Sequence, residues 1–360
     1  MTHLRSALVA ASFALVSIAA LTQTTLAQNP PPSTTLLSCR AVAINPTTNK
    51  IYAVDKNRDA IFVENPAANV TSSISVGKGP VAIAVNPRTN RIYVANNESG
   101  TVSVIDGESD SVIATVSVGP LPYVLAVSEA SNRVYVSNTF SDLLTIIDGV
   151  SNATRTLKTG SADAIVVDPK AGKVYLLGYE DVNLNVLDEA TGALSRIPIG
   201  MHLWSMALNP ATNTLYVTLV GSAAVVSVDE RSHALRTIPA GRIPSAVAVN
   251  PATNTVYVTN YQDDTVTVID GSKQVPIATV RVGAYPQAIA VDPKANRVYV
   301  ANTHGSSVTV IDGTTNVAVA TLKAGNSPYA IAVNPVTGRP SVANLDTPSF
   351  ITMTPPRAHQ

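Results

Sequence analysis

Cysteine and tryptophan are almost absent from this sequence of 360 residues, which contains one of each. A single cysteine cannot form a disulfide within the chain, so the fold must be stabilised by the burial of apolar side chains. Charged residues are also scarce, at 13% of the chain, and the 24 basic residues balance the 24 acidic ones. This neutral balance argues against a protein that coats nucleic acid or anionic lipid, because such binding depends on clustered Lys and Arg.

Long apolar runs are missing after the first segment of the chain. That segment has the layout of a secretory signal peptide, with Arg5 in a short polar start and an apolar run over Ala7–Leu21. No later stretch of about 20 apolar residues could span a bilayer. We therefore expect a signal peptide over 1–27, a Pro-rich linker over 28–33, and an exported protein that is periplasmic, extracellular or at the cell surface.

Two short phrases recur along the rest of the chain. One resembles Ala-Ile-Ala-Val-Asn-Pro and occurs eight times, and the other resembles Arg-Ile-Tyr-Val-Ala-Asn. The tyrosine of the second phrase stands at Tyr52, Tyr93, Tyr135, Tyr175, Tyr216, Tyr257 and Tyr299, in steps of 41, 42, 40, 41, 41 and 42 residues. Each period contains four strand-length runs rich in Val, Ile, Thr and Tyr. Asn-Pro and Asp-Gly turn signals separate these runs, and no helical period is present.

Four-stranded antiparallel sheets that repeat about every 41 residues are typical of the blades of a β-propeller. We therefore predict an all-β protein with a single β-propeller over 34–354 and a disordered tail at 355–360. Eight blades account for every strand if an N-terminal segment at 34–37 supplies the fourth strand of the last blade and so closes the ring. Seven blades are the alternative, because Pro340 and Pro348 interrupt the last repeat.

Three of the repeats carry a family signature. Tyr257–Asn260 spells Tyr-Val-Thr-Asn, and Tyr299–Asn302 and Tyr93–Asn96 are close variants. In this respect the chain resembles the YVTN family of β-propeller repeat proteins, and the similarity covers essentially all of the mature chain. The resemblance implies an exported or surface-exposed propeller of bacterial or archaeal type. It also implies a ring that is often seven-bladed, and most members lack a defined biochemical activity.

Repetition separates residues that hold the blades together from residues that could bind a ligand. A side chain present in every blade serves the blade, whereas a ligand site belongs where the copies differ. We therefore interpret the repeat tyrosines as packing between blades. The asparagines that close the second phrase are interpreted as caps that bond to the backbone at strand ends, and the aspartates of Asp-Gly as turn formers.

Two kinds of loop are expected to share one face of the ring, which we call the variable face: the loops between strands two and three of a blade, and the linkers from strand four to the next blade. The Asn-Pro and Asp-Gly turns lie on the opposite face, which we call the turn face. Loops between strands two and three contribute Lys56, Arg58, Glu98, Phe140, Asp142, Tyr179, Glu180, Asp181, Tyr261, Asp263, Asp264 and His304 to the variable face.

The mouth of the central channel on the variable face is the candidate ligand site. It is predicted to be ringed by the residues that open the innermost strands, together with some of their neighbours. The candidate ligand-binding residues are Arg40, Tyr123, Asp163, His202, Trp204, Arg242, Tyr285, Gln287 and Tyr329. Aromatic faces can stack on flat groups while charged and amide side chains orient polar edges. Alternatively, Tyr123 and Trp204 plug the channel and the charges form a solvated rim.

Catalytic signatures are absent from the sequence. It contains no Gly-x-Ser-x-Gly, phosphate loop, Cys-x-x-Cys or haem-attachment motif, and no two histidines of the mature chain stand at a close ligand spacing. We therefore predict no catalytic residue, no metal site and no cofactor. Asp163 is interpreted as a surface carboxylate that balances Arg40 or Arg242.

Three functions remain open at this point. The first is a non-enzymatic, exported scaffold that recognises a protein, glycan or small ligand on the variable face. The second is a periplasmic propeller that binds single-stranded DNA, which the neutral charge and the acidic residues of the loops oppose. The third is a metal-dependent, lactonase-like hydrolase with its ion at Asp163, although such sites gather several carboxylates and the predicted mouth has one.

Overall fold

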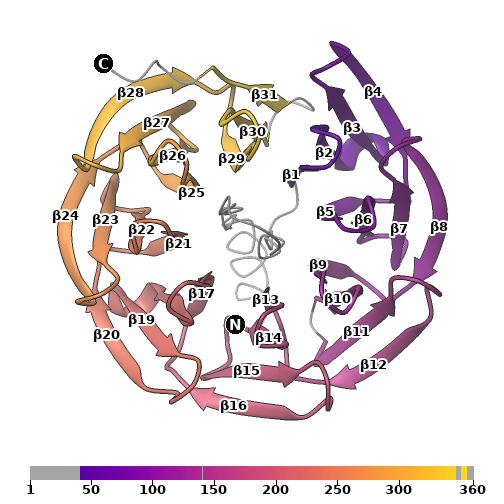
Figure 1. Cartoon of the computed structure of the whole chain (residues 1–360), viewed down its shortest axis with the longest axis horizontal. Coiled ribbons are helices and arrows are strands. Elements are labelled where there is room, and N and C mark those ends of the chain that lie inside the picture. The colour runs from indigo at the N-terminus through magenta and orange to yellow at the C-terminus, as the bar shows by residue number, and fades with distance from the viewer. Residues whose placement is uncertain (1–40, 140, 346–349, 355–360) are drawn as a thin grey trace, which may run out of the picture.

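The computed structural model describes residues 41–139, 141–345 and 350–354. Within these residues the chain forms eight antiparallel sheets that surround a central axis as the blades of a β-propeller (Figure 1). The prediction of eight blades is confirmed, and the seven-bladed alternative is wrong. The predicted signal peptide, linker, N-terminal strand and C-terminal tail lie outside the described residues.

Each blade is a meander whose first strand is innermost and whose last strand lies at the rim (Figure 1). The strands of blades 1 to 4 are β1 (Val42–Ile44), β2 (Ile51–Asp55), β3 (Ala60–Asn65), β4 (Val70–Ser75), β5 (Pro80–Asn86), β6 (Arg91–Asn96), β7 (Thr101–Asp106), β8 (Ser111–Ser117), β9 (Pro122–Ser128), β10 (Arg133–Asn138), β11 (Leu143–Asp148), β12 (Thr154–Lys158), β13 (Ala164–Asp168), β14 (Lys173–Leu177), β15 (Asn183–Asp188) and β16 (Leu194–Pro198).

The second half of the ring repeats this plan. The strands of blades 5 to 8 are β17 (Leu203–Asn209), β18 (Thr214–Leu219), β19 (Ala224–Asp229), β20 (Leu235–Pro239), β21 (Pro244–Asn250), β22 (Thr255–Asn260), β23 (Thr265–Asp270), β24 (Val275–Arg281), β25 (Pro286–Asp292), β26 (Arg297–Asn302), β27 (Ser307–Asp312), β28 (Val317–Lys323), β29 (Pro328–Val333), β30 (Pro340–Asn344) and β31 (Phe350–Thr352). Short 3-10 turns η1 (Lys56–Arg58) and η2 (Val220–Ser222) follow β2 and β18. Neither described helix is long and apolar enough to cross a membrane.

In most blades the middle of the second strand is apolar at successive positions, as in Ile92–Ala95 of β6, because both faces of the sheet meet a neighbouring blade. In β22, Val256 and Val258 pack in a cluster with residues of blade 5, whereas Tyr257 packs in a cluster with residues of blade 7. All three side chains are fully buried. The seven repeat tyrosines are likewise at most 2% exposed, which confirms that they pack between blades.

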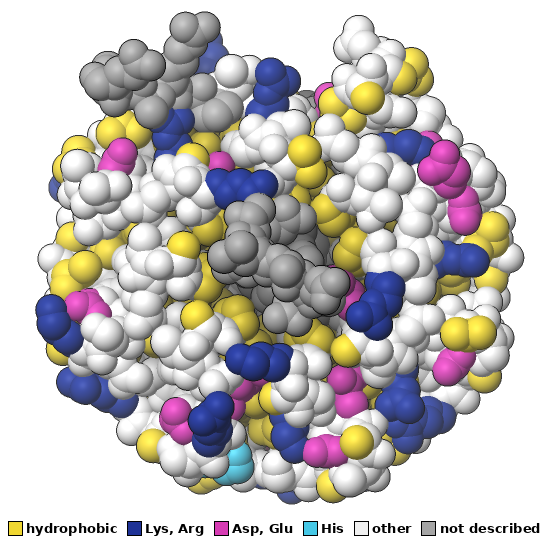
Figure 2. All heavy atoms as spheres, in the orientation of Figure 1, with side chains coloured by type: hydrophobic (Ala, Val, Ile, Leu, Met, Phe, Trp, Pro, Cys, Tyr) yellow, Lys and Arg dark blue, Asp and Glu magenta, His cyan; other side chains and the backbone are white. Residues whose placement is uncertain are grey.

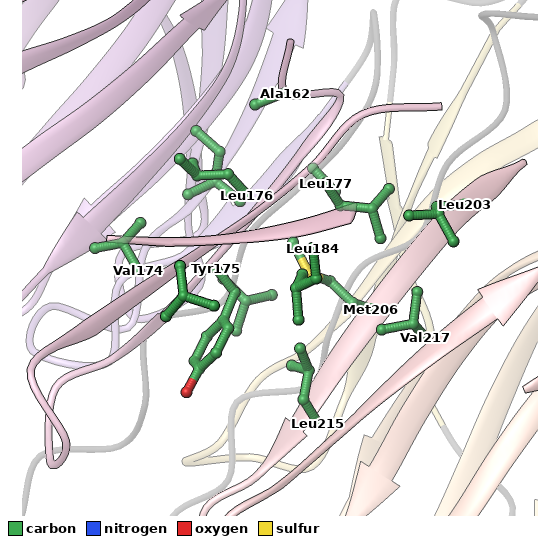
Figure 3. Close-up of a cluster of buried hydrophobic side chains, with 14 of the residues drawn as sticks. Ala162, Val174, Tyr175, Leu176, Leu177, Leu184, Leu203, Met206, Leu215 and Val217 are labelled. Atoms are coloured by element: carbon green, nitrogen blue, oxygen red, sulfur yellow. The ribbon is translucent and has the colours of Figure 1, made fainter. Parts of the chain in front are cut away.

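The core of the molecule is therefore a series of layers between blades. At the contact between blades 4 and 5, side chains of β14 meet those of β17 and β18 (Figure 3). Tyr175 and Leu177 lie on one side of this layer, and Met206, Leu215 and Val217 lie on the other. Because each blade needs a neighbour on both sides, an open stack would expose two such layers, and the ring leaves none.

The turns that follow the first strands are joined by asparagine pairs at five of the eight contacts between blades on the turn face. The asparagine of an Asn-Pro turn donates Nδ2–H to Oδ1 of the asparagine that ends the matching turn of the next blade. These pairs are Asn45 to Asn90, Asn86 to Asn132, Asn209 to Asn254, Asn250 to Asn296 and Asn334 to Asn49, at 2.5 to 2.8 Å. The accepting asparagines have positive φ, as the turn prediction requires. The last pair joins blade 8 to blade 1, so the ring closes with the same contact.

The Asp-Gly dipeptides stand at hairpin turns, as predicted, and these turns are longer than two residues. Four residues separate β7 from β8, and the residue with positive φ is Asp110, not Gly107. Gly107 is needed for a different reason, because an added Cβ would clash with Oδ1 of Asn90 from the neighbouring turn. The glycine therefore allows the hairpin to pack against the asparagine pairs of the turn face.

Blade 8 has three strands within the described residues, and its repeat is degenerate. Ser341 pairs with Ala332 as Tyr257 pairs with Ala248, so serine takes the place of the eighth tyrosine. Pro340 opens β30 opposite Val333, a strand start where a missing N–H is tolerated. Pro340 therefore does not abolish the blade, and Pro348 lies outside the described residues.

The closing strand predicted at residues 34–37 can be tested by truncation. We expect a chain that starts at Ser38 to melt several degrees lower than one that starts at Gln28, because β31 would lose the strand that covers its outer edge. Differential scanning calorimetry of the two chains measures this difference. A chain in which residues 28–33 are replaced by Gly and Ser keeps the predicted strand and should melt like the longer one. Equal melting of all three would contradict the closure.

Candidate functional site

A repeated backbone hydrogen bond builds the variable face. The first residue after the second strand donates its N–H to the carbonyl of a linker residue with positive φ. These pairs are Asn97 to Gly79, Thr139 to Leu121, Val220 to His202, Tyr261 to Ile243, Thr303 to Tyr285 and Leu345 to Ser327. The two kinds of loop therefore share one face, as predicted. A left-handed backbone is unfavourable for bulky residues, so this hydrogen bond helps to hold side chains such as those of His202 and Tyr285 in place.

Four of the predicted site residues are not placed on a surface by the structure. Arg40 lies outside the described residues. Tyr123, Gln287 and Tyr329 are 8%, 3% and 0% exposed, so they belong to the interior. Oε1 of Gln287 accepts a hydrogen bond from the hydroxyl of Thr303 at 2.9 Å, which ties the first strand of blade 7 to its own loop.

Asp163, His202 and Trp204 come together with Tyr179 at the contact between blades 4 and 5. The ring of Tyr179 lies 5.3 Å from that of His202 and 5.4 Å from that of Trp204, centroid to centroid. Tyr179 donates its backbone N–H to Oδ2 of Asp163 at 2.8 Å. Burial raises the pKa of Asp163 above its ordinary value, and this hydrogen bond partly offsets the effect. We call these four residues the first aromatic cluster.

The polar groups of this cluster are only partly satisfied. His202 is exposed, whereas Asp163, Tyr179 and Trp204 are half-buried. The Nε1–H of Trp204 is shielded from solvent and has no hydrogen-bond partner among the described residues. A buried donor without a partner costs roughly 1–3 kcal/mol, so this position favours a ligand that brings an acceptor.

A second aromatic cluster lies at the contact between blades 6 and 7. The ring of Tyr285 is 4.9 Å from that of Tyr261 and 4.5 Å from that of His304. The backbone N–H of Tyr285 donates to Oδ1 of Asp264 at 2.8 Å, much as Asp163 holds Tyr179. Tyr285 is 40% exposed and His304 is also exposed. Of these residues, only Tyr285 belongs to the candidate set from the sequence.

Arg242 lies between the two clusters, on the linker from blade 5 to blade 6. Its Nε and its backbone N–H donate to the two carboxylate oxygens of Asp263 at 2.5 and 2.7 Å. These contacts lower the pKa of Asp263. Arg242 therefore pairs with Asp263. Of the two arginines that the sequence analysis offers as partners of Asp163, the other, Arg40, lies outside the described residues. Beside this pair is a groove of about 520 Å³, lined by Pro239, Ala240, Gly241, Asn260, Asp263, Thr265, Thr267, Pro276 and Thr279.

The repeated asparagines at the ends of the second strands bond mainly to side chains. Nδ2 of Asn260 donates to the hydroxyls of Thr265 and Thr267, both at 2.9 Å. Asn96 and Asn302 bond to hydroxyls of the next strand in the same way. Asn138 follows the prediction, with hydrogen bonds to backbone carbonyls at 2.6 and 3.2 Å. Asn260 follows it in part, because its Oδ1 accepts from the backbone N–H of Gly241 at 3.0 Å. Asn96, Asn260 and Asn302 also hold the loop between strands two and three through hydroxyl groups.

Buried glutamates on the turn face were missed by the sequence analysis. Glu189 and Glu230 replace the glycine of Asp-Gly in two successive blades, and Glu129 replaces the proline of Asn-Pro. Tyr135 and two serines donate to the carboxylate of Glu189. Burial raises the pKa of Glu129 and of Glu230 to about 7. The signal that could have found them is a break in an otherwise repeated dipeptide.

Charge and metal-ligand chemistry are sparse in the described residues. No group of three or more His, Cys, Asp or Glu side chains is arranged there to hold a metal ion. On the face shown in Figure 2, Lys and Arg are interspersed with Asp and Glu, and neither sign forms a continuous patch. This surface offers no basic track of the kind that nucleic-acid backbones require.

Comparison with known proteins identifies the fold alone. Neither a protein-family model nor a curated protein matches the sequence. Kuenenia stuttgartiensis hydrazine synthase matches in structure, with a TM-score of 0.61 and 17% identity over 81% of this chain and 98% of that chain. Dihydro-heme d1 dehydrogenase NirN, solved in complex with DHE, has a TM-score of 0.69 and 16% identity over 83% of this chain and 69% of that chain. The likeness shows a propeller fold. These are two of 1385 matching chains, and a fold so widely used carries no single activity.

Proposed function

We propose that this protein is an exported, YVTN-type β-propeller that acts as a binding scaffold and catalyses no reaction. It recognises a protein, glycan or small ligand on the variable face. The supporting observation is that the repeat is broken on this face by two aromatic clusters. Both include an exposed histidine, and in both a carboxylate fixes the backbone of a central tyrosine.

The ring departs from its own symmetry in the side chains that its linkers carry. The linker position with positive φ is glycine in blade 2, leucine in blade 3, isoleucine in blade 6 and serine in blade 8, but it carries a ring only in blade 5, as His202, and in blade 7, as Tyr285. The backbone conformation is therefore shared around the ring, and the aromatic side chains are what distinguish these two junctions. Partly exposed aromatic rings then provide the apolar contact area that recognition sites use.

Trp204 is the natural reporter for this proposal because it is the only tryptophan and belongs to the first cluster. We expect its fluorescence to change saturably with a member of a panel of cell-wall sugars, single-stranded oligonucleotides, haem, lactones and calcium. Haem is included because NirN, which is similar in fold, is solved in complex with DHE. Tyr179→Ala should weaken the binding at least about tenfold, because aromatic stacking contributes roughly 1–3 kcal/mol.

The matched control is His233→Ala, which removes an exposed ring from the hairpin between β19 and β20 on the turn face. It should leave the affinity unchanged. Binding that falls steeply with salt would instead favour the single-stranded DNA hypothesis. Metal-dependent turnover of a lactone would favour the hydrolase. A Trp204 signal that no panel member changes, or one that Tyr179→Ala leaves intact, would contradict the proposed site.

A further inference from the structure

We propose that the ligand of the variable face is a carbohydrate chain, held by both aromatic clusters and by the groove between them. This inference rests on the proposed function and narrows its ligand to one class. The two clusters lie at the contacts between blades 4 and 5 and between blades 6 and 7, and the groove lies at the contact between blades 5 and 6. The three features therefore follow one another around the left and lower part of the ring in Figure 1.

The first aromatic cluster has the mixed chemistry that a sugar ring satisfies. Tyr179 and His202 offer ring faces or edges, and Asp163 offers carboxylate acceptors. Trp204 offers an N–H donor that has no partner among the residues that the structure describes. Sugar hydroxyls both donate and accept, and the C–H face of the sugar is apolar. One bound sugar can therefore contact a ring, donate to Asp163 and accept from Trp204. A ligand with only donors or only acceptors would leave one of these groups unsatisfied.

The groove at the contact between blades 5 and 6 continues this polar, weakly charged character. Its lining includes the hydroxyls of Thr265, Thr267 and Thr279 and the amide of Asn260. The one carboxylate in its wall, that of Asp263, is already paired with Arg242. The groove therefore presents no net charge of its own to a ligand. Its volume of about 520 Å³ lies within the range of small-ligand sites.

The second aromatic cluster repeats the elements of the first. Tyr261, Tyr285 and His304 supply the rings, and Asp264 holds the backbone N–H of Tyr285. Both clusters thus pair apolar rings with a carboxylate that has spare acceptor capacity. Two similar subsites on one face favour a ligand that itself repeats, because binding at one subsite raises the effective concentration at the other. A chain of sugar units is such a ligand.

Other ligand classes fit these features less well. Each cluster contains an aspartate, and these carboxylates would repel the phosphates of single-stranded DNA. An organic ammonium ion would suit rings and carboxylates but brings no acceptor for the indole of Trp204. A flat apolar cofactor would stack on the rings but would bring no acceptor for the indole N–H of Trp204.

The test uses the mature protein and a glycan array of neutral and acidic oligosaccharides of defined length, followed by calorimetry with the best series. We expect affinity to rise at least about tenfold when the oligosaccharide becomes long enough to reach both clusters. Tyr179→Ala and Tyr285→Ala should each remove that gain, and the double variant should reduce binding to that of a single sugar or less. Trp204→Phe keeps an aromatic ring but loses the N–H, and should weaken binding by roughly tenfold.

Three outcomes separate this inference from the proposed function. Length-dependent binding that both tyrosine variants weaken supports the carbohydrate chain. If another class from the fluorescence panel binds at Tyr179 and no glycan on the array binds, the inference is overturned and the scaffold stands. If nothing binds to the variable face, both are overturned. Because the replaced rings are partly exposed, unchanged melting temperatures for the variants confirm that a loss of binding is not a loss of folding.

Discussion

Raising the pH from 4.5 to above 7 is expected to destabilise this protein through its buried glutamates. Glu129 is 1% exposed, and burial raises its pKa from 4.5 to about 7. Below pH 4.5 the carboxyl is protonated in both the folded and the unfolded state, so its contribution to stability is fully present. As the pH rises, the unfolded state releases the proton first, and the contribution is lost as the pH passes through about 7. The loss for Glu129 amounts to at most about 3 kcal/mol.

Urea unfolding at pH 5 and pH 8 measures this effect. Glu129→Gln keeps the shape of the neutral acid but cannot ionise, so it should lose less stability than the parent between pH 5 and pH 8 and be more stable than the parent at pH 8. Glu230→Gln should act in the same direction with a smaller effect, because Glu230 is only half-buried. The turn aspartates have lowered pKa values, so their contributions vanish only at more acidic pH and do not obscure this range.

Glu189→Gln is the matched control for these variants. Its carboxylate accepts hydrogen bonds from Ser128, Ser131 and Tyr135 at 2.7 to 3.1 Å, so the ionised form is satisfied in the fold. An amide offers one acceptor oxygen in place of two, and the variant should therefore be less stable than the parent at both pH values. A parent protein whose stability is flat between pH 5 and pH 8 would contradict the assignment to Glu129 and Glu230.

The repeat made the architecture predictable because each blade is specified locally. The step between tyrosines gives the blade, the number of Ala-Ile-Ala-Val-Asn-Pro phrases gives the ring of eight, and the loop types give the two faces. The packing role of the tyrosines also followed, because a residue present in nearly every copy must serve what every copy shares. These inferences required only the period of the pattern and the turn chemistry of residues such as Asn90.

The orientation of side chains at the channel could not be predicted in the same way. Tyr123 and Tyr329 open innermost strands, and their position in sequence gives their height along the channel. It does not show which neighbour they face, because side chains of a strand alternate between two sheet faces and both faces meet another blade in a ring. Both side chains are therefore buried between blades. Residues on the linkers, such as His202 and Tyr285, are not part of a strand, so their side chains are not confined to the contacts between blades.

The aromatic clusters could not be predicted without knowing which loops contact each other. Tyr179 and His202 are separated in sequence by the two outer strands β15 and β16, and a backbone hydrogen bond between adjacent loops helps to bring their junction together. The sequence placed both residues on the variable face but did not pair them. The glutamates were missed for another reason. Candidate residues were sought in the loops of the variable face, whereas Glu189 and Glu230 replace the glycine of the repeated Asp-Gly dipeptide on the turn face.

The repeat tyrosines should differ sharply in the role of their hydroxyls, although their rings are equally buried. Replacing Tyr93 or Tyr257 by alanine is expected to cost roughly 3–5 kcal/mol of unfolding free energy, because it opens a cavity between two blades. Replacement by phenylalanine should be nearly neutral, since neither hydroxyl has a hydrogen-bond partner among the described residues. Urea unfolding of the four variants measures both effects.

Tyr135→Phe provides the contrasting case within the same repeat position. Its hydroxyl donates to Oε1 of Glu189 at 2.7 Å, in a buried site. Removing it leaves a buried carboxylate with one donor fewer, which should cost about 1–3 kcal/mol even though the ring is kept. Equal stability of all three phenylalanine variants would show that the hydroxyl of Tyr135 contributes nothing to the contact between blades 3 and 4. If only Tyr135→Phe lowers the free energy of unfolding, the hydrogen bond from Tyr135 to Glu189 stabilises the contact between blades 3 and 4 in addition to the packing of the ring.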